Sequence, residues 1–205
     1  MLIVSIYVDD IIYTGSSIED FKVDMMHKYE MTYLGLLHHF LGMGVMQTES
    51  SIFIHQKKYA TSLLKKFGLQ DCKCVSIPLV PGDKLRTDDD SGAVDVAQFK
   101  KIVGSLLYLT ATRPNIMYAS CLLARFIHYL TNKHYGTTKR VLRYIQGILD
   151  YGLEYKKGQG AMLFGFCDSD WSGSEGPQSS NIVLNYPRLK QTTSVQQKLL
   201  HKQLG

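Results

Sequence analysis

The sharpest chemical feature of the sequence is a pair of adjacent aspartates, Asp9 and Asp10, which follows an apolar run. Two carboxylates at a tight turn repel each other unless a cation neutralises them, and hard divalent cations prefer such oxygen ligands. Two divalent ions a few ångströms apart can activate a hydroxyl group and stabilise a leaving pyrophosphate. A solvated Asp-Asp turn without a ligand is the alternative. The flanks, with Tyr7 two positions before the first aspartate, favour the cation site.

A second group of candidate residues consists of basic side chains between residues 133 and 149. The apolar residues of this stretch recur at helical spacing, which leaves Lys133, Lys139, Arg140 and Arg143 on the other faces of the helix. A basic face of this kind can follow a phosphate backbone with an affinity that depends on salt but not on base sequence. An ordinary solvated helix face is the alternative interpretation.

A β-hairpin is expected to position the two aspartates. Side chains alternate from Leu2 to Val8, and a second β-rich run follows at residues 11–13. The break between these runs predicts a turn at Asp9-Asp10.

Further helices and strands follow from periodicity and capping residues. The predicted helix N-caps are Ser16 or Ser17, Asp95 and Asn115, and Gly68 is a predicted helix stop. The tail from about residue 175 has weak apolar periodicity and is expected to be disordered, with at most one helical turn near Leu199. The predicted elements are a helix from Ser16 or Ser17 to about His27, a hairpin over 38–55 with its turn at 48–51, helices over about 57–67, 95–110, 115–130 and 133–149, and strands over about 152–157 and 161–168.

Composition limits the class of protein. The 205 residues are 45% hydrophobic and 20% charged, which excludes wholesale disorder, collagen and coiled-coil rods. The net charge of +5 permits a polyanionic partner without requiring one. No apolar run reaches the roughly 18 residues of a membrane span, and no signal peptide is recognisable. We therefore expect a cytoplasmic or nuclear protein that neither enters a membrane nor is secreted.

Residues 2–15, LIVSIYVDDIIYTG, resemble the catalytic hairpin of reverse transcriptases, specifically those of copia-type long-terminal-repeat retrotransposons. Further motifs similar to this family follow in the expected order, and together they cover about residues 2–174. They are MTYLG at 31–35, HFLG at 39–42, QKKY at 56–59, LKKF at 64–67, GSLLYL at 104–109, TRP at 112–114, His134, KRVLRY at 139–144 and YGL at 151–153.

The resemblance implies an α+β fold with a partial reverse-transcriptase palm hairpin, a helical connection region and the first strands of a ribonuclease H-like fold. It divides the chain into a palm/thumb-like segment at 1–80, a linker at 81–94, a helical connection at 95–150, the start of a ribonuclease H-like domain at 151–174 and a divergent, disordered tail at 175–205.

The resemblance also implies roles for individual residues. Asp9 and Asp10 would be catalytic metal ligands of the palm, with Mg²⁺ or Mn²⁺ as the cofactor. Tyr7 would lie beside the primer terminus, although a strand aromatic packed on a neighbour is an equal alternative. Residues 40–42 would belong to the hairpin that grips the primer. Asp168, with Asp170 as the alternative, would be a catalytic metal ligand at the start of ribonuclease H.

The partners implied are an RNA or DNA template–primer, whose backbone the four basic residues would track, and virus-like particles in an intact element. The family's third palm aspartate, its fingers and most ribonuclease H ligands are absent from these 205 residues. We therefore expect a remnant of an RNA-directed DNA polymerase, inactive alone, which binds metal weakly or not at all. The alternatives are a non-catalytic nucleic-acid-binding or interaction module and a spurious gene model. Exposed strand edges would allow self-association.

Overall fold

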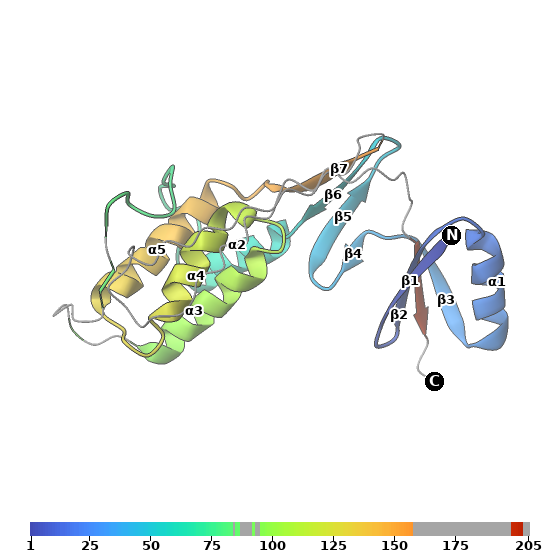
Figure 1. The fold of residues 1–205 in the computed structure, drawn as a ribbon, viewed down its shortest axis with the longest axis horizontal. Helices are drawn as coiled ribbons and strands as arrows, with labels where there is room; N and C mark the ends of the chain where they lie inside the picture. The colour runs from blue at the N-terminus through green and yellow to red at the C-terminus, as the bar shows by residue number, and fades with distance from the viewer. Residues whose placement is uncertain (84, 87–91, 93–94, 158–197, 203–205) are drawn as a thin grey trace. The chain divides into compact units, whose positions relative to one another are not determined.

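The computed structural model describes residues 1–83, 85–86, 92, 95–157 and 198–202 of the chain. In this part of the chain, α-helices accompany two antiparallel sheets, which confirms the predicted α+β class (Figure 1). The chain divides into two compact units. One unit, called here the sheet unit, contains Met1–Ile54 with residues 154–157 and 198–202. The other, called here the helical unit, contains His55–Leu153.

The amino-terminal hairpin has the predicted strands and a turn displaced by one residue. Strands β1 (Leu2–Tyr7) and β2 (Asp10–Gly15) pair antiparallel, and Tyr7 pairs with Asp10. The two-residue turn is therefore Val8-Asp9, one position earlier than the sequence predicted. The first turn residue has a φ of 52°, which is the left-handed conformation that tight hairpin turns require.

The first sheet has the strand order β1-β2-β8-β3. Strand β3 (Met31–Leu36) was not predicted, and β8 (Lys198–Lys202) pairs antiparallel with both β2 and β3. The prediction that the tail is disordered, or at most one helical turn, is therefore wrong for residues 198–202. Because β8 lies far from β2 and β3 in the sequence, no local pattern of residues predicts their pairing. The rest of the tail and the strand predicted at 161–168 lie outside the described residues.

Helix α1 (Ile18–Lys28) confirms the first predicted helix. Ser17 precedes it with a φ of 59°, and its side chain makes no capping hydrogen bond, so the serine cap was wrong. The helix packs on β2 through Phe21, whose ring centroid lies 5.1 Å from that of Tyr13. Tyr13 is fully buried, and its hydroxyl has no hydrogen-bond partner among the described residues. Burial, helped by the charges of Tyr33 and Glu19, raises the pKa of Tyr13 to about 12.

Replacing Tyr13 by phenylalanine is expected to change the free energy of unfolding at pH 7 by less than about 1 kcal/mol, because the lost hydroxyl donates no hydrogen bond. The raised pKa predicts a difference at high pH. The unfolded tyrosine ionises near pH 10 whereas the folded one keeps its proton to about 12, so wild-type stability falls as the pH rises through this window. Urea unfolding of both proteins at pH 7 and 11 measures this. A Tyr13→Phe variant that loses as much stability as wild type at pH 11 would contradict it.

The second sheet has the strand order β4-β5-β6-β7. The predicted turn at 48–51 is confirmed, since Thr48 Oγ1 accepts a hydrogen bond of 2.9 Å from the Ser51 amide. The long strand predicted before this turn is broken at Leu41-Gly42, where both residues have positive φ. Strand 152–157 is confirmed with one residue fewer. The strands are β4 (His39–Phe40), β5 (Met43–Gln47), β6 (Ser51–His55) and β7 (Gly152–Lys156).

The helical unit confirms the helices predicted from apolar periodicity, but the helix predicted over 115–130 is shorter at both ends and the one predicted over 133–149 ends three residues earlier. Asp95 caps its helix, since its Oδ1 accepts hydrogen bonds of 2.9 and 3.1 Å from the Ala97 and Gln98 amides. Asn115 is not a cap, because it lies in a 3₁₀ turn and its Nδ2 donates to the Tyr144 hydroxyl at 2.7 Å. The elements are α2 (Lys57–Lys66), α3 (Val96–Leu109), the 3₁₀ helix η1 (Pro114–Ile116), α4 (Met117–Arg125) and α5 (Asn132–Gln146).

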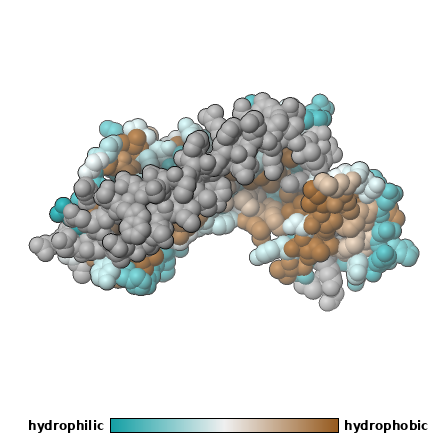
Figure 2. Space-filling model, in the orientation of Figure 1, coloured by the Kyte–Doolittle hydropathy of each residue, from teal (hydrophilic) through white to brown (hydrophobic). Residues whose placement is uncertain are grey.

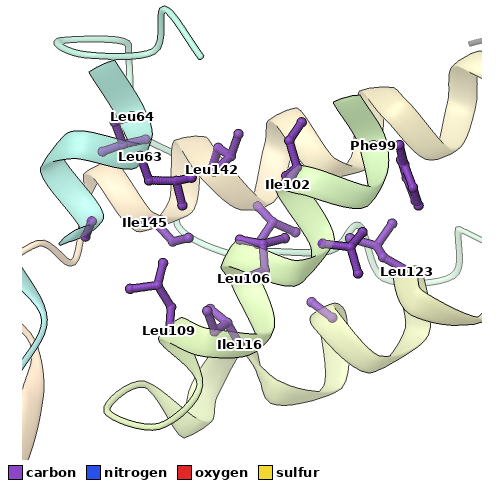
Figure 3. Close-up of a cluster of buried hydrophobic side chains, with 14 of the residues drawn as sticks. Leu63, Leu64, Phe99, Ile102, Leu106, Leu109, Ile116, Leu123, Leu142 and Ile145 are labelled. Atoms are coloured by element: carbon purple, nitrogen blue, oxygen red, sulfur yellow. The ribbon is translucent and has the colours of Figure 1, made fainter. Parts of the chain in front are cut away.

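One apolar core joins all four helices of this unit (Figure 3). Helix α3 runs through its centre, with Phe99, Ile102 and Leu106 essentially inaccessible to solvent. Helix α2 contributes Leu63 and Leu64, so it packs with helices that come after the 81–94 segment. Burial on this scale stabilises the unit without cross-links, since each buried leucine or phenylalanine contributes about 1.5–3 kcal/mol.

A buried polar network lies beside this core and explains the TRP motif structurally. Arg113 is almost fully buried, and its guanidinium donates to the Leu149 carbonyl at 3.0 Å and to Thr112 Oγ1 at 3.3 Å. The Thr112 hydroxyl donates to Gln56 Oε1 at 2.8 Å, and the Gln56 amide donates to the Tyr108 carbonyl. Desolvation by burial lowers the pKa of Arg113. This arginine therefore ties the ends of α2, α3 and α5 together.

Candidate functional site

The two aspartates lie together at one end of the β1–β2 hairpin. Asp9 is the second turn residue and Asp10 opens β2, and both are half-buried. Carboxylate pairs of this kind suit Mg²⁺, which proteins commonly bind through one or two carboxylates while water and substrate phosphates complete the octahedron. No group of three or more His, Cys, Asp and Glu side chains suited to a metal occurs in the described part of the chain. The two carboxylates therefore do not by themselves make up such a group, and a metal site at this turn stays a prediction.

The turn that carries the aspartates is joined to a second motif through two aromatic rings. The ring of Tyr7 lies edge-on to that of Phe40, with centroids 6.0 Å apart. Phe40 ends β4 and is followed by the tight Leu41-Gly42 turn. The packing alternative for Tyr7 is thus observed, and about half of its side chain stays exposed. The structure brings together two motifs that the sequence separates by thirty residues.

Strand β1 forms an apolar edge of its sheet. Ile6 is 70% exposed and Val8 is 80% exposed, and brown surface covers this strand in Figure 2. An unpaired apolar edge can recruit another strand. Self-association of the chain stays a prediction.

The four basic residues predicted on the last helix line one half-open cavity of about 750 Å³. They recur at helical spacing on α5, so they lie along one side of that helix. The loop of residues 79–83, Leu85 and helix α4 provide the other walls. The cavity lies entirely within the helical unit.

Two of the basic residues have contacts at the cavity that hold their side chains. The ammonium group of Lys133 lies 2.7 Å from Asp83 Oδ1, which ties the loop to α5. The ammonium group of Lys139 lies over the ring of Tyr135, 4.6 Å from its centroid. Both contacts therefore restrain a cation that lines the cavity.

The two arginines differ in the hydrogen bonds that their Nε atoms make. Arg143 Nε donates a 3.0 Å hydrogen bond to the Lys73 carbonyl and so anchors a preceding loop. Arg140 Nε is buried and has no hydrogen-bond partner among the described residues. Arg140 therefore keeps one hydrogen-bond donor without a partner in the described part of the chain.

Sequence reasoning missed the residues that complete the cavity. Asp83 lies in the predicted linker, and Tyr118 lies on α4 with 60% of its side chain exposed. A signal for Tyr118 existed, since an aromatic residue off the apolar stripe of a helix has no core to fill. Nothing local links residues 79–85 to α5. Asp168 and Asp170 lie outside the described residues, so their assignment stays a prediction.

Comparison with known proteins supports the family resemblance seen in the motifs. Residues 1–81 match the family described as reverse transcriptase (RNA-dependent DNA polymerase). An uncharacterized mitochondrial protein of Arabidopsis thaliana is 37% identical over 179 residues, covering 85% of this chain and 74% of that protein. The retrovirus-related Pol polyprotein from transposon RE1 of the same plant is 32% identical, covering 83% of this chain and 12% of the polyprotein. That from transposon TNT 1-94 of Nicotiana tabacum is 30% identical, covering 84% and 14%. No solved structure matches.

The chain belongs to the reverse transcriptase family. Within this class it corresponds to one part of a copia-type retrotransposon Pol polyprotein, which confirms the resemblance seen in its motifs. It spans about an eighth of the two polyproteins named above. None of the helices described here combines the length and apolar character needed to cross a membrane.

Proposed function

We propose that this chain binds a template–primer nucleic acid as the part of a copia-type reverse transcriptase that extends from the catalytic hairpin of the palm into the helical connection. The contact between Tyr7 and Phe40 carries this proposal, because it joins the aspartate hairpin to the turn that the family resemblance assigns to the primer. The family supports the reaction class, which is RNA-directed DNA polymerisation. The carboxylates of Asp9 and Asp10 would be the metal ligands for that reaction.

Asp9 and Asp10 would hold Mg²⁺ or Mn²⁺ against phosphate oxygens at the primer end. The ion, when bound, would neutralise charge that develops on the transferred phosphoryl group. The half-exposed ring of Tyr7 would limit where the terminal nucleotide can lie, while Phe40 fixes the orientation of that ring. Two carboxylates do not fix two ions, so the 205-residue chain is expected not to extend a primer alone. The ribonuclease H role of Asp168 belongs to the same proposal.

The helical unit would contribute affinity. If each of its four cavity cations neutralises one phosphate of an RNA–DNA hybrid, log K falls with log salt concentration with a slope of about −3.6, at 0.9 per contact. A Lys139→Gln variant is expected to reduce that slope by about 1. Fluorescence anisotropy with a labelled hybrid between 50 and 200 mM salt measures it.

Lys65→Gln is the matched control. This lysine is exposed on α2 and does not line the cavity, so its removal should leave the slope within error of wild type. Absence of any hybrid binding at low salt would contradict the proposed function.

A non-catalytic nucleic-acid-binding module is the second candidate. The confinement of the basic cavity to the helical unit favours it, because that unit carries neither Asp9 nor Asp10. It predicts hybrid binding that needs no divalent cation and is unchanged when both aspartates become asparagine.

A further inference from the structure

The cavity of the helical unit has walls of two chemical kinds. One wall is cationic and comes from α5, with Lys133, Lys139, Arg140 and Arg143. The rest of the described lining is largely apolar and aromatic. It is made by Leu79 and Pro81 of the loop and by Tyr118 and Leu122 of α4.

The cationic wall favours a phosphate group. Among the described lining residues, four cations accompany one carboxylate, that of Asp83, which is already paired with Lys133. The buried Nε–H of Arg140 has no partner among the described residues, so one donor of this guanidinium is left unsatisfied there. Guanidinium–phosphate hydrogen bonds are among the strong charge-assisted kind, so an anion in the cavity would stabilise this arrangement.

The apolar wall favours a base over a second phosphate. Tyr118 is 60% exposed, and its ring borders the cavity next to Leu122 on the following turn of α4. Bases of single strands stack on such exposed rings, whereas a duplex keeps the faces of its bases inside the helix. A volume of about 750 Å³ falls within the roughly 300–1,000 Å³ typical of small-ligand sites. The cavity is therefore large enough for one nucleotide, and its lining offers both cationic and aromatic partners.

We propose that this cavity binds one unpaired nucleotide of a single-stranded segment, with its base against Tyr118 and its phosphate against Arg140 and Lys139. The inference deepens the proposed function, on which it rests, because it assigns an unpaired part of the template–primer to the helical unit. It predicts that the chain binds single strands more tightly than duplexes. Binding along a duplex backbone alone would not produce this preference.

The test uses the full 205-residue chain and two fluorescein-labelled probes, a dT12 single strand and a 12-base-pair duplex. Wild type should bind dT12 more tightly than the duplex. Tyr118→Ala should weaken dT12 binding at least about fivefold, the lower limit for loss of a base–aromatic stack, and duplex binding by less than twofold. Tyr118→Phe keeps the ring and should restore dT12 binding. Arg140→Gln should weaken dT12 binding by a similar factor or more.

Matched controls separate the cavity from general surface effects. Tyr129→Ala removes another ring, 54% exposed, that does not line the cavity, and Lys65→Gln removes a charge from α2. Both should bind dT12 like wild type. Thermal unfolding by circular dichroism should show all five variants folded, since every substituted side chain is exposed or half-buried.

Four outcomes would overturn the inference. Equal losses for Tyr118→Ala and Tyr129→Ala, with salt-dependent hybrid binding intact, would remove the cavity site and leave the proposed function standing. Tighter binding of the duplex than of dT12 would do the same. Competition by free dTMP at concentrations equal to the dT12 Kd would indicate a mononucleotide site instead of a strand site. Loss of binding to every nucleic acid would defeat the proposed function as well.

Discussion

Replacing Leu106 by alanine is expected to lower the free energy of unfolding of the helical unit by about 3 kcal/mol. This side chain has no exposed surface and lies at the centre of the core formed by α2, α3, α4 and α5 (Figure 3). Truncation removes the transfer free energy of the leucine and leaves a cavity that the surrounding helices close only in part. Urea unfolding followed by far-ultraviolet circular dichroism measures the loss.

Leu107→Ala is the control for this experiment. The next residue on the same helix is 39% exposed, so its truncation should cost less than about 1 kcal/mol. The pair has the same chemistry and nearly the same helix position, and only burial differs. Similar losses for the two variants would mean that α3 does not run through the core as described.

The second large effect is expected at the aspartate turn. Asp9→Asn and Asp10→Asn should each weaken Mn²⁺ binding to the chain with a bound hybrid at least about tenfold, because a neutral amide replaces a charged oxygen ligand. Electron paramagnetic resonance of free Mn²⁺ measures the affinity. Removal of the metal with a chelator should leave salt-dependent binding through α5 in place, since that binding needs only the basic side chains.

Asp24→Asn supplies the matched control for charge. This aspartate lies exposed on α1, away from the hairpin turn, and should leave Mn²⁺ affinity unchanged. If it weakens Mn²⁺ binding as much as the turn variants do, the ion responds to the overall charge of the sheet unit and not to the two turn carboxylates.

Local patterns in the sequence predict the parts of the fold that local interactions build. Alternation in β1 and β2 predicts the hairpin, and the Asp95 cap with its apolar stripe predicts α3 almost to the residue. The turn is displaced by one position because Asp10 pairs with Tyr7, a register that depends on twist and cannot be read from alternation. A helix boundary near Asn115 was misplaced because its side chain bonds to Tyr144, far away in the chain.

The site shows the same division between local and distant effects. Residue type and spacing single out the aspartates and the basic residues of α5 as candidates, and the family resemblance adds Tyr7; their roles stay predictions. Two contacts depend on tertiary packing. They are the ring contact between Tyr7 and Phe40 and the ion pair between Lys133 of α5 and Asp83 of the loop. Strand β8 pairs with β2 and β3 from the far end of the chain, and such pairing has no periodic signature.

The proposed function requires the aspartate turn to hold a divalent cation at the end of a bound primer. Nuclear magnetic resonance of a hybrid bound to the full chain tests it most directly, with substoichiometric Mn²⁺ as the probe. The resonances of the 3′-terminal nucleotide should broaden with wild type and stay sharp with the Asp9→Asn/Asp10→Asn double variant. Equal broadening with both proteins, or broadening spread evenly along the duplex, would contradict the account.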